Sequence, residues 1–130
     1  MDPTHEEIRA LVEAFYRRVR SDPRLGPIFE RHVADWDQHT ERLTDFWHSL
    51  MLTSGRYKGN PFAVHRAFAG ELDMDLFDRW LSLWQAATQE TFPPELAARF
   101  QFKASRVAES FKAGLLFDPA ARDRDPGVTR

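Results

Sequence analysis

The sequence predicts an all-α protein with four long helices and two short ones, and three observations support this. Apolar residues recur at helical spacing, for example at Ile8, Leu11, Val12, Phe15 and Val19. Prolines, glycines and helix-capping residues separate the segments that carry this spacing. No segment shows the alternating apolar and polar pattern of a strand.

The first predicted helix begins at a capping box, Thr4-His-Glu-Glu7, in which the first and last side chains satisfy each other's backbone N–H groups. It ends before Pro23, because a proline disfavours helical conformation at the residue before it. Residues 25–29 predict a tight turn and one short helical turn, with Pro27 at the first helical position.

A central helix is predicted from Asp35, its N-cap, to Leu52, with Gly55 as a left-handed stop. One face carries large side chains and one titratable ring: Trp36, His39, Leu43, Phe46, Trp47 and Leu50. The other face should be solvated and carries Asp37, Gln38, Glu41, Arg42 and Asp45. Two indoles and a phenylalanine around one histidine indicate a wall that faces something flat and bulky.

The second half of the chain contains a loop over 57–61, a short helix over 62–68 and two long helices. The first long helix covers about 73–88, and the second begins at Pro93-Pro94. We expect one domain over residues 1–117, and a polar, disordered tail over 118–130.

Composition narrows the function classes. The formal net charge is −2 with acids and bases interspersed, which argues against a nucleic-acid or membrane-surface partner. The absence of cysteine excludes disulfides, thiolate metal sites and catalytic thiols. The polar N-terminus and the lack of a long apolar run predict a cytoplasmic protein.

Two histidines are predicted among apolar side chains, whereas His5 and His32 are expected at the surface. His39 lies in the aromatic stripe, and His65 lies on the short helix beside Phe62, Val64 and Phe68. A single imidazole among aromatic residues suits axial ligation of haem iron, because the porphyrin supplies four ligands. Zinc would need three or four ligands, and the sequence shows no cluster of them. The alternative for His39 is a satisfied core residue, and the alternative for His65 is a buried histidine hydrogen-bonded to a carbonyl.

Tyr16 and Trp80 are the other polar side chains expected near the interior. Tyr16 borders the buried face of the first helix, where a phenol needs a hydrogen-bond partner. Trp80 can point its indole N–H into a cavity. The alternatives are a tyrosine at the surface and a tryptophan that is plain core.

These motifs together resemble the truncated haemoglobins, and group III within them. They are FY at 15–16, LGPIF at 25–29, DW at 35–36, His39, FW at 46–47, Y-x-G-x-P at 57–61, His65 and RWLxLW at 79–84. Each motif is weak alone, but the set is specific and covers about residues 5–116. The glycine pairs typical of the other truncated groups are absent.

The resemblance implies a two-over-two helical sandwich that binds haem b (iron protoporphyrin IX), with His65 as the proximal iron ligand. Tyr16, His39 and Trp80 would be the polar distal residues. The other cofactor-binding residues would be Phe29, stacked on the porphyrin, and Leu43, Phe46, Trp47 and Tyr57. The propionates would meet Tyr57 and nearby Lys58 or Arg66.

Three functions follow from these residues. The first is a haem protein that reversibly binds O2 and related diatomic ligands, with Tyr16 and Trp80 donating hydrogen bonds and His39 acting as a gate or proton donor. The second is a haem catalyst acting on nitric oxide, nitrite or peroxide, with a reductase as a candidate partner. The third is a cofactor-free helical interaction domain.

Overall fold

A computed structural model of the chain describes residues 2–55 and 73–116. These residues form five helices and no strand: α1 (His5–Ser21), α2 (Leu25–His32), α3 (Trp36–Leu52), α5 (Met74–Thr91) and α6 (Pro94–Leu116). None of them is long and apolar enough to cross a membrane. The predicted loop over 57–61, the short helix over 62–68 and the tail lie outside the described residues.

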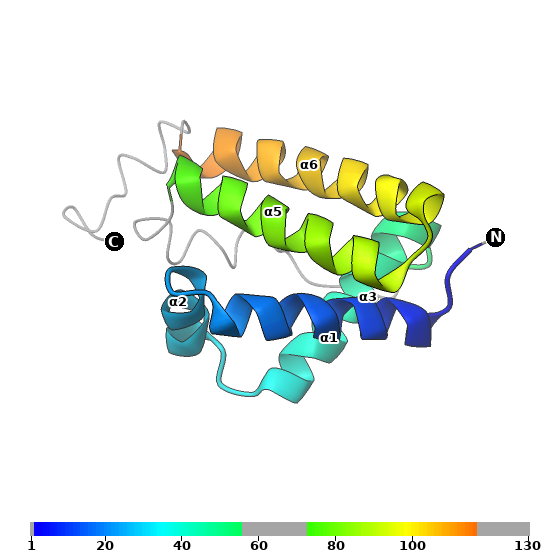
Figure 1. Ribbon diagram of the computed structural model, residues 1–130, viewed down its shortest axis with the longest axis horizontal. Coiled ribbons are helices and arrows are strands. Elements are labelled where there is room, and N and C mark those ends of the chain that lie inside the picture. The colour runs from blue at the N-terminus through cyan, green and yellow to red at the C-terminus, as the bar shows by residue number, and fades with distance from the viewer. Residues whose placement is uncertain (1, 56–72, 117–130) are drawn as a thin grey trace.

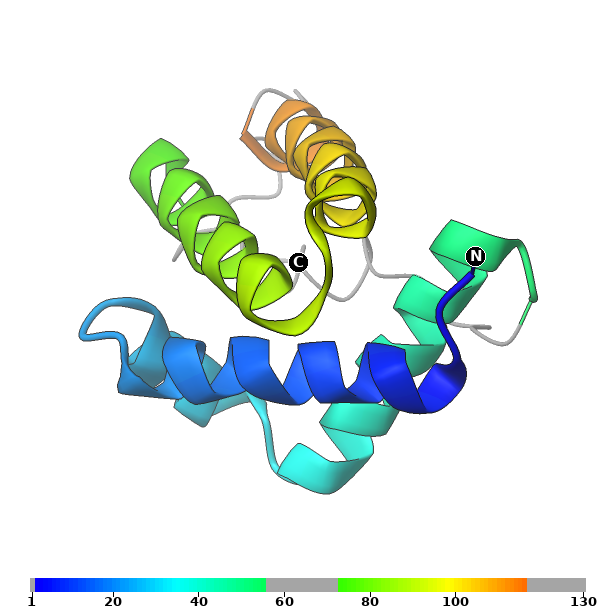
Figure 2. The ribbon, with the colours of Figure 1, turned by 45° about the vertical axis from the view of Figure 1, so that its right-hand side comes forward.

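The helices form two layers of two. α5 and α6 lie side by side and run in opposite directions as one layer, and α1 and α3 form the other (Figure 1). α1 packs against α5 and crosses α3 at a steep angle, as Figure 2 shows. α2 packs against α1 near its C-terminal end. α1 therefore makes extensive contacts with α2, α3 and α5, the described helices other than α6.

α1 and α3 begin at the capping residues that the sequence predicts. The Glu7 amide donates to Thr4 Oγ1 at 3.1 Å and the Thr4 amide donates to Glu7 Oε1 at 2.8 Å, which completes the capping box. The Asp35 carboxylate accepts from the Gln38 amide at 3.1 Å at the start of α3.

The start of α2 differs from the prediction. The helix begins at Leu25, so Pro27 is its third residue instead of its first. The Asp22 carboxylate accepts hydrogen bonds from the Arg24 amide at 3.0 Å and the Leu25 amide at 2.8 Å, which starts the helix earlier. Pro27 is tolerated there because the first N–H groups of a helix have no intrahelical partner. A Cβ added at Gly26 would lie 2.9 Å from the Arg20 carbonyl oxygen, so glycine permits this close approach.

The prediction for α3 needs two corrections. Thr53, with φ of 51°, is the left-handed C-cap that ends the helix, although Gly55 is also left-handed with φ of 74°. The predicted solvated face is wrong at Glu41 and Asp45, which are half-buried because α1 lies across that side of α3.

The core is built mainly from aromatic side chains. Trp47 and Trp84 stack with their ring centroids 4.5 Å apart and are 2% and 1% exposed. The indole N–H of Trp84 donates to the Phe100 carbonyl oxygen at 3.3 Å, which satisfies its polar atom inside the core. These rings join α3, α5 and α6 into one interior.

Asp22 also joins α1 and α2 to α5, because it pairs with Arg79. Burial opposes ionisation of this carboxyl, but hydrogen bonds from two backbone amides and the Arg79 guanidinium outweigh it. The pKa of Asp22 is therefore below its usual value.

Asp22→Asn should lower the free energy of unfolding at neutral pH by about 1.5–3 kcal/mol, the range for hydrogen bonds to a charged group. The folded-state pKa is depressed, so this contribution is full above the unfolded-state pKa, near about pH 4, and is lost as pH falls through the folded-state value. Urea unfolding as a function of pH measures the effect, and the variant should lose less stability on acidification. Glu13→Gln, an exposed carboxylate paired with Arg9, is the control. Equal changes in both variants would contradict the role of Asp22.

Candidate functional site

A cavity of about 210 Å³ lies between the two layers and is lined by residues of all five described helices. Its walls are mostly apolar and aromatic. Seven residues that the sequence singles out lie on it: Tyr16, Phe29, His39, Leu43, Phe46, Trp47 and Trp80. The two other candidates, Tyr57 and His65, lie outside the described residues.

The most informative contact in the cavity joins Tyr16 of α1 to His39 of α3. The Tyr16 hydroxyl lies 2.9 Å from His39 Nε2, within hydrogen-bond distance. Tyr16 is 6% exposed and His39 is half-buried. The interpretation of Tyr16 as a surface residue is therefore wrong, and the phenol has the partner that its burial requires.

The tautomer of His39 decides what the phenol can do. If Nε2 carries the proton, it donates to the Tyr16 oxygen and leaves the phenol O–H free to donate elsewhere. If Nε2 is unprotonated, it accepts the phenol proton instead. The pair can therefore present either a donor or an acceptor without any change of backbone.

Burial raises the pKa of the Tyr16 phenol well above its usual value. The phenol consequently stays protonated over the whole physiological pH range. Tyr16 is therefore a persistent O–H donor.

Aromatic rings hold the pair in place. Tyr16 lies with its ring centroid 5.7 Å from Phe29 and 5.3 Å from Trp36. Phe29 stacks on Trp36 at 6.4 Å, and the guanidinium of Arg20 lies 4.5 Å from the centre of the same indole. Rigid rings leave these polar atoms little freedom to move.

Trp80 forms part of the opposite wall. Its ring is nearly parallel to that of Trp84, 6.2 Å away at 3°, and meets the ring of Phe15 edge-on at 5.8 Å. Trp80 is half-buried, whereas Trp84 is core. This arrangement fixes the plane of the Trp80 indole beside the cavity.

Sequence patterns did not predict that two further polar side chains, the imidazole of His32 and the guanidinium of Arg42, line the cavity. His32, expected in a polar connection, is the last residue of α2, and Arg42 was assigned to the solvated face of α3. Both are exposed, yet both line the cavity. The available signal was the position of Arg42 three residues after His39, which places it on an adjoining stripe of the helix.

A model of the family described as bacterial-like globin matches residues 4–108. The chain belongs to that family. This globin is 29% identical over 111 residues to the group 3 truncated haemoglobin ctb of Campylobacter jejuni, a match that covers 82% of this chain and 87% of the relative. The crystal structure of group III truncated haemoglobin from Campylobacter jejuni aligns with a TM-score of 0.82 at 28% identity, over 88% of this chain and 92% of that one. The resemblance to group III and the predicted two-over-two globin fold are both confirmed.

Membership in the family implies a haem-binding globin, and the cavity of this globin fits that cofactor. A porphyrin has two apolar faces, and the cavity offers aromatic and aliphatic walls. The polar atoms of Tyr16 and His39 are concentrated on one wall, where they can meet a small ligand. The cofactor-free interpretation is therefore not retained.

The raised pKa of Tyr16 can be tested by alkaline titration. The chain has two tyrosines, so Tyr57→Phe leaves Tyr16 as its single phenol. Phenolate absorbance of this variant should appear only well above pH 10.0, the ordinary value, while the protein is folded. Because the folded-state pKa exceeds the unfolded-state one, stability should also fall as pH rises above that value. Titration near the ordinary pKa in folded protein would show that Tyr16 is solvated. The double variant without tyrosine supplies the baseline spectrum.

Proposed function

We propose that this globin binds haem b and reversibly binds O2 and related diatomic ligands at the cavity. The observation that carries the proposal is the hydrogen-bonded pair of Tyr16 and His39, 2.9 Å apart, on a wall that is otherwise apolar. A fixed hydrogen-bond donor on this wall would stabilise a diatomic ligand that carries partial negative charge, as O2 would on haem iron.

His65 is proposed as the proximal iron ligand. The support is its position in the family motif and its single imidazole in an apolar segment, Phe62 to Phe68. Its second ring nitrogen would need an acceptor that fixes the tautomer. Arg42, exposed at the cavity, adds a candidate partner for the propionates beside the predicted Tyr57, Lys58 and Arg66.

Haem, when bound, supplies the iron to which a diatomic ligand attaches. The protein supplies the surroundings of that ligand. His39 with a proton on Nε2 donates to the Tyr16 oxygen, so the phenol O–H can point into the cavity. Phe29, Phe46 and Trp47 give the cavity an apolar lining beside this pair. One charge-assisted hydrogen bond of this kind is worth roughly 1.5–3 kcal/mol, or about ten- to a hundred-fold in the dissociation rate.

Trp80 is proposed as a second donor, because its indole lies on the cavity lining in a fixed plane. Two donors would make ligand release slow. Slow release suits sensing, scavenging or redox chemistry better than oxygen delivery. The haem-catalyst alternative uses the same residues, and turnover with a reductase or with peroxide distinguishes it from reversible binding.

His65→Ala should abolish stable haem retention, because it removes the proposed protein ligand of the iron. Absorption spectra of the ferric, ferrous and ferrous–CO forms, together with a haem-transfer assay, measure the loss. His48→Ala is the matched control, because His48 bonds Ser54 at 2.7 Å and does not line the cavity. Retention of the native spectrum and haem affinity in His65→Ala would refute the proximal assignment.

Tyr16→Phe should raise the O2 dissociation rate by up to about a hundred-fold, since it removes only the hydroxyl. In His39→Leu the phenol loses its orienting partner, so adding Tyr16→Phe should have a smaller effect in that background, with a coupling of at least about 0.5 kcal/mol. Stopped-flow ligand displacement on the four proteins of this cycle measures both quantities. Trp80→Phe, which keeps a ring but loses the N–H, reports on the second donor. If the O2 dissociation rate is unchanged in Tyr16→Phe but faster in Trp80→Phe, Trp80 and not Tyr16 is the main hydrogen-bond donor to the ligand.

A further inference from the structure

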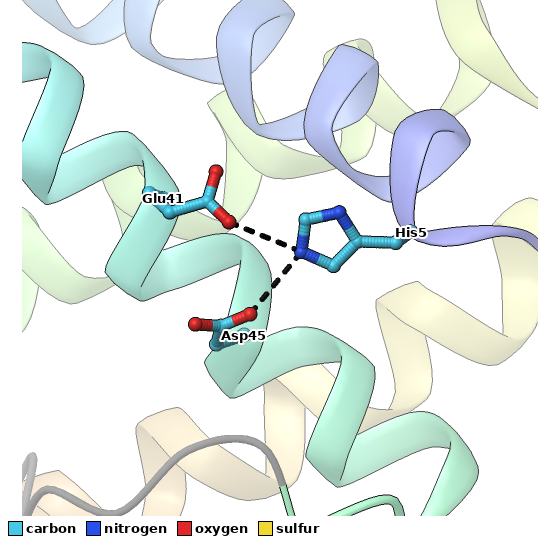
Figure 3. Close-up of side chains that lie close together, drawn as sticks. All are labelled: His5, Glu41 and Asp45. Carbon is cyan, nitrogen blue, oxygen red and sulfur yellow. Dashed lines mark hydrogen bonds and ion pairs between the residues drawn. The ribbon is translucent and has the colours of Figure 1, made fainter.

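Outside the cavity, the geometry points to a site for a divalent transition-metal ion formed by His5, Glu41 and Asp45 (Figure 3). His5 is the first residue of α1, and the two carboxylates come from consecutive turns of α3. Their ligand atoms all lie within 4.8 Å of one another. Sequence spacing did not reveal this group, because α1 supplies the imidazole and α3 the carboxylates.

The three ligand atoms converge on one point. His5 Nε2 lies 3.3 Å from Glu41 Oε2 and 3.1 Å from Asp45 Oδ1, and Figure 3 shows it facing both carboxylates. Ligands held about 2.0–2.2 Å from a tetrahedral zinc ion are roughly 3.3–3.6 Å apart, so only small side-chain adjustments would admit an ion. Water would complete the coordination.

The backbones that carry these ligands are fixed before any ion arrives. The capping box of Thr4 and Glu7 holds the first turn of α1, and therefore His5. Glu41 and Asp45 are four residues apart on α3, so they project from the same face of a rigid helix. A preorganised ligand set loses little conformational entropy on binding.

The charge around this group favours a cation. Arg9 is shared among Glu13, Asp37 and Glu41, and its contact with Glu41 uses Oε1, which leaves Oε2 facing His5. The ion pair found for Asp45 is with His5, which is charged only when protonated. The carboxylates of Glu41 and Asp45 bring negative charge to this group, which a divalent ion would neutralise.

The donor set selects the class of ion. One imidazole nitrogen with two carboxylate oxygens suits zinc and its first-row neighbours, whereas calcium and magnesium prefer oxygen ligands alone. The side chains of His5 and Asp45 are 25% and 29% exposed, so the group is reachable from solvent yet partly buried. A bound ion would link α1 to α3.

Isothermal titration of the haem-loaded full chain with Zn2+ tests the proposal. The wild type should bind one Zn2+ saturably at this site, and its melting temperature should rise with zinc concentration, because the ion binds the folded state. His5→Ala and Asp45→Asn should each weaken Zn2+ binding at least ten-fold and remove the thermal shift. Excess Ca2+ or Mg2+ should not displace the ion.

Asp37→Asn is the matched control, because it removes a carboxylate on the same helix whose side chain is 97% exposed and which is not a proposed ligand. It should keep wild-type Zn2+ affinity. Circular dichroism of each variant establishes whether it is folded. If His5→Ala does not fold, Asp45→Asn still tests the site. Absence of saturable binding, or equal Zn2+ affinity in both ligand variants and the wild type, would overturn the site. Neither result bears on haem binding.

Discussion

The hydrogen bond between Tyr16 and His39 is the constraint on which the cavity depends. It joins α1 to α3 through two side chains that would otherwise leave polar atoms in an aromatic interior. A phenol this deeply buried without a partner would destabilise the fold, and filling the space with a hydrocarbon would remove the polar wall. The bond therefore satisfies both polar groups within the packed interior and places them on the cavity lining.

Aromatic packing explains how a cavity persists beside that bond. The stacked rings of Trp47, Trp84 and Trp80 all line the cavity, and edge-on contacts with Phe15 hold Trp80 and Trp84. Flat, rigid side chains cannot collapse into a small void as flexible aliphatic chains can. They also surround the polar pair with apolar surface, and a hydrogen bond in such low-dielectric surroundings is stronger than one in water.

Local sequence predicted much of the fold and of the candidate site. Caps at Thr4 and Asp35 depend on neighbouring residues alone, so both helix starts could be predicted. Helical spacing placed His39 on the same side of α3 as Phe46, and both line the cavity. The partner of Tyr16 was not predictable in this way, because the approach of α1 to α3 depends on the packing of the whole domain.

The same limit explains the wrong predictions. The early start of α2 follows from Asp22, whose side chain is positioned by burial and by Arg79 of α5, a residue far away in sequence. Glu41 and Asp45 looked solvated because an isolated helix gives no sign that another helix will cross its polar side. His5 gave no sign either, since its partners come from α3. Polar side chains that meet between helices are therefore the least predictable part of this site.

The residues of α3 show how one helix can contact the cavity on one side and α1 on another. His39, Leu43 and Phe46 face the cavity, whereas Asp37, Glu41 and Asp45, spaced four residues apart, meet His5 and Arg9 of α1. α1 and α3 are therefore joined by polar contacts that extend along α1 from His5 through Arg9 to Tyr16, a span of roughly 16 Å. His39 therefore meets Tyr16 from a helix whose polar face is also joined to α1.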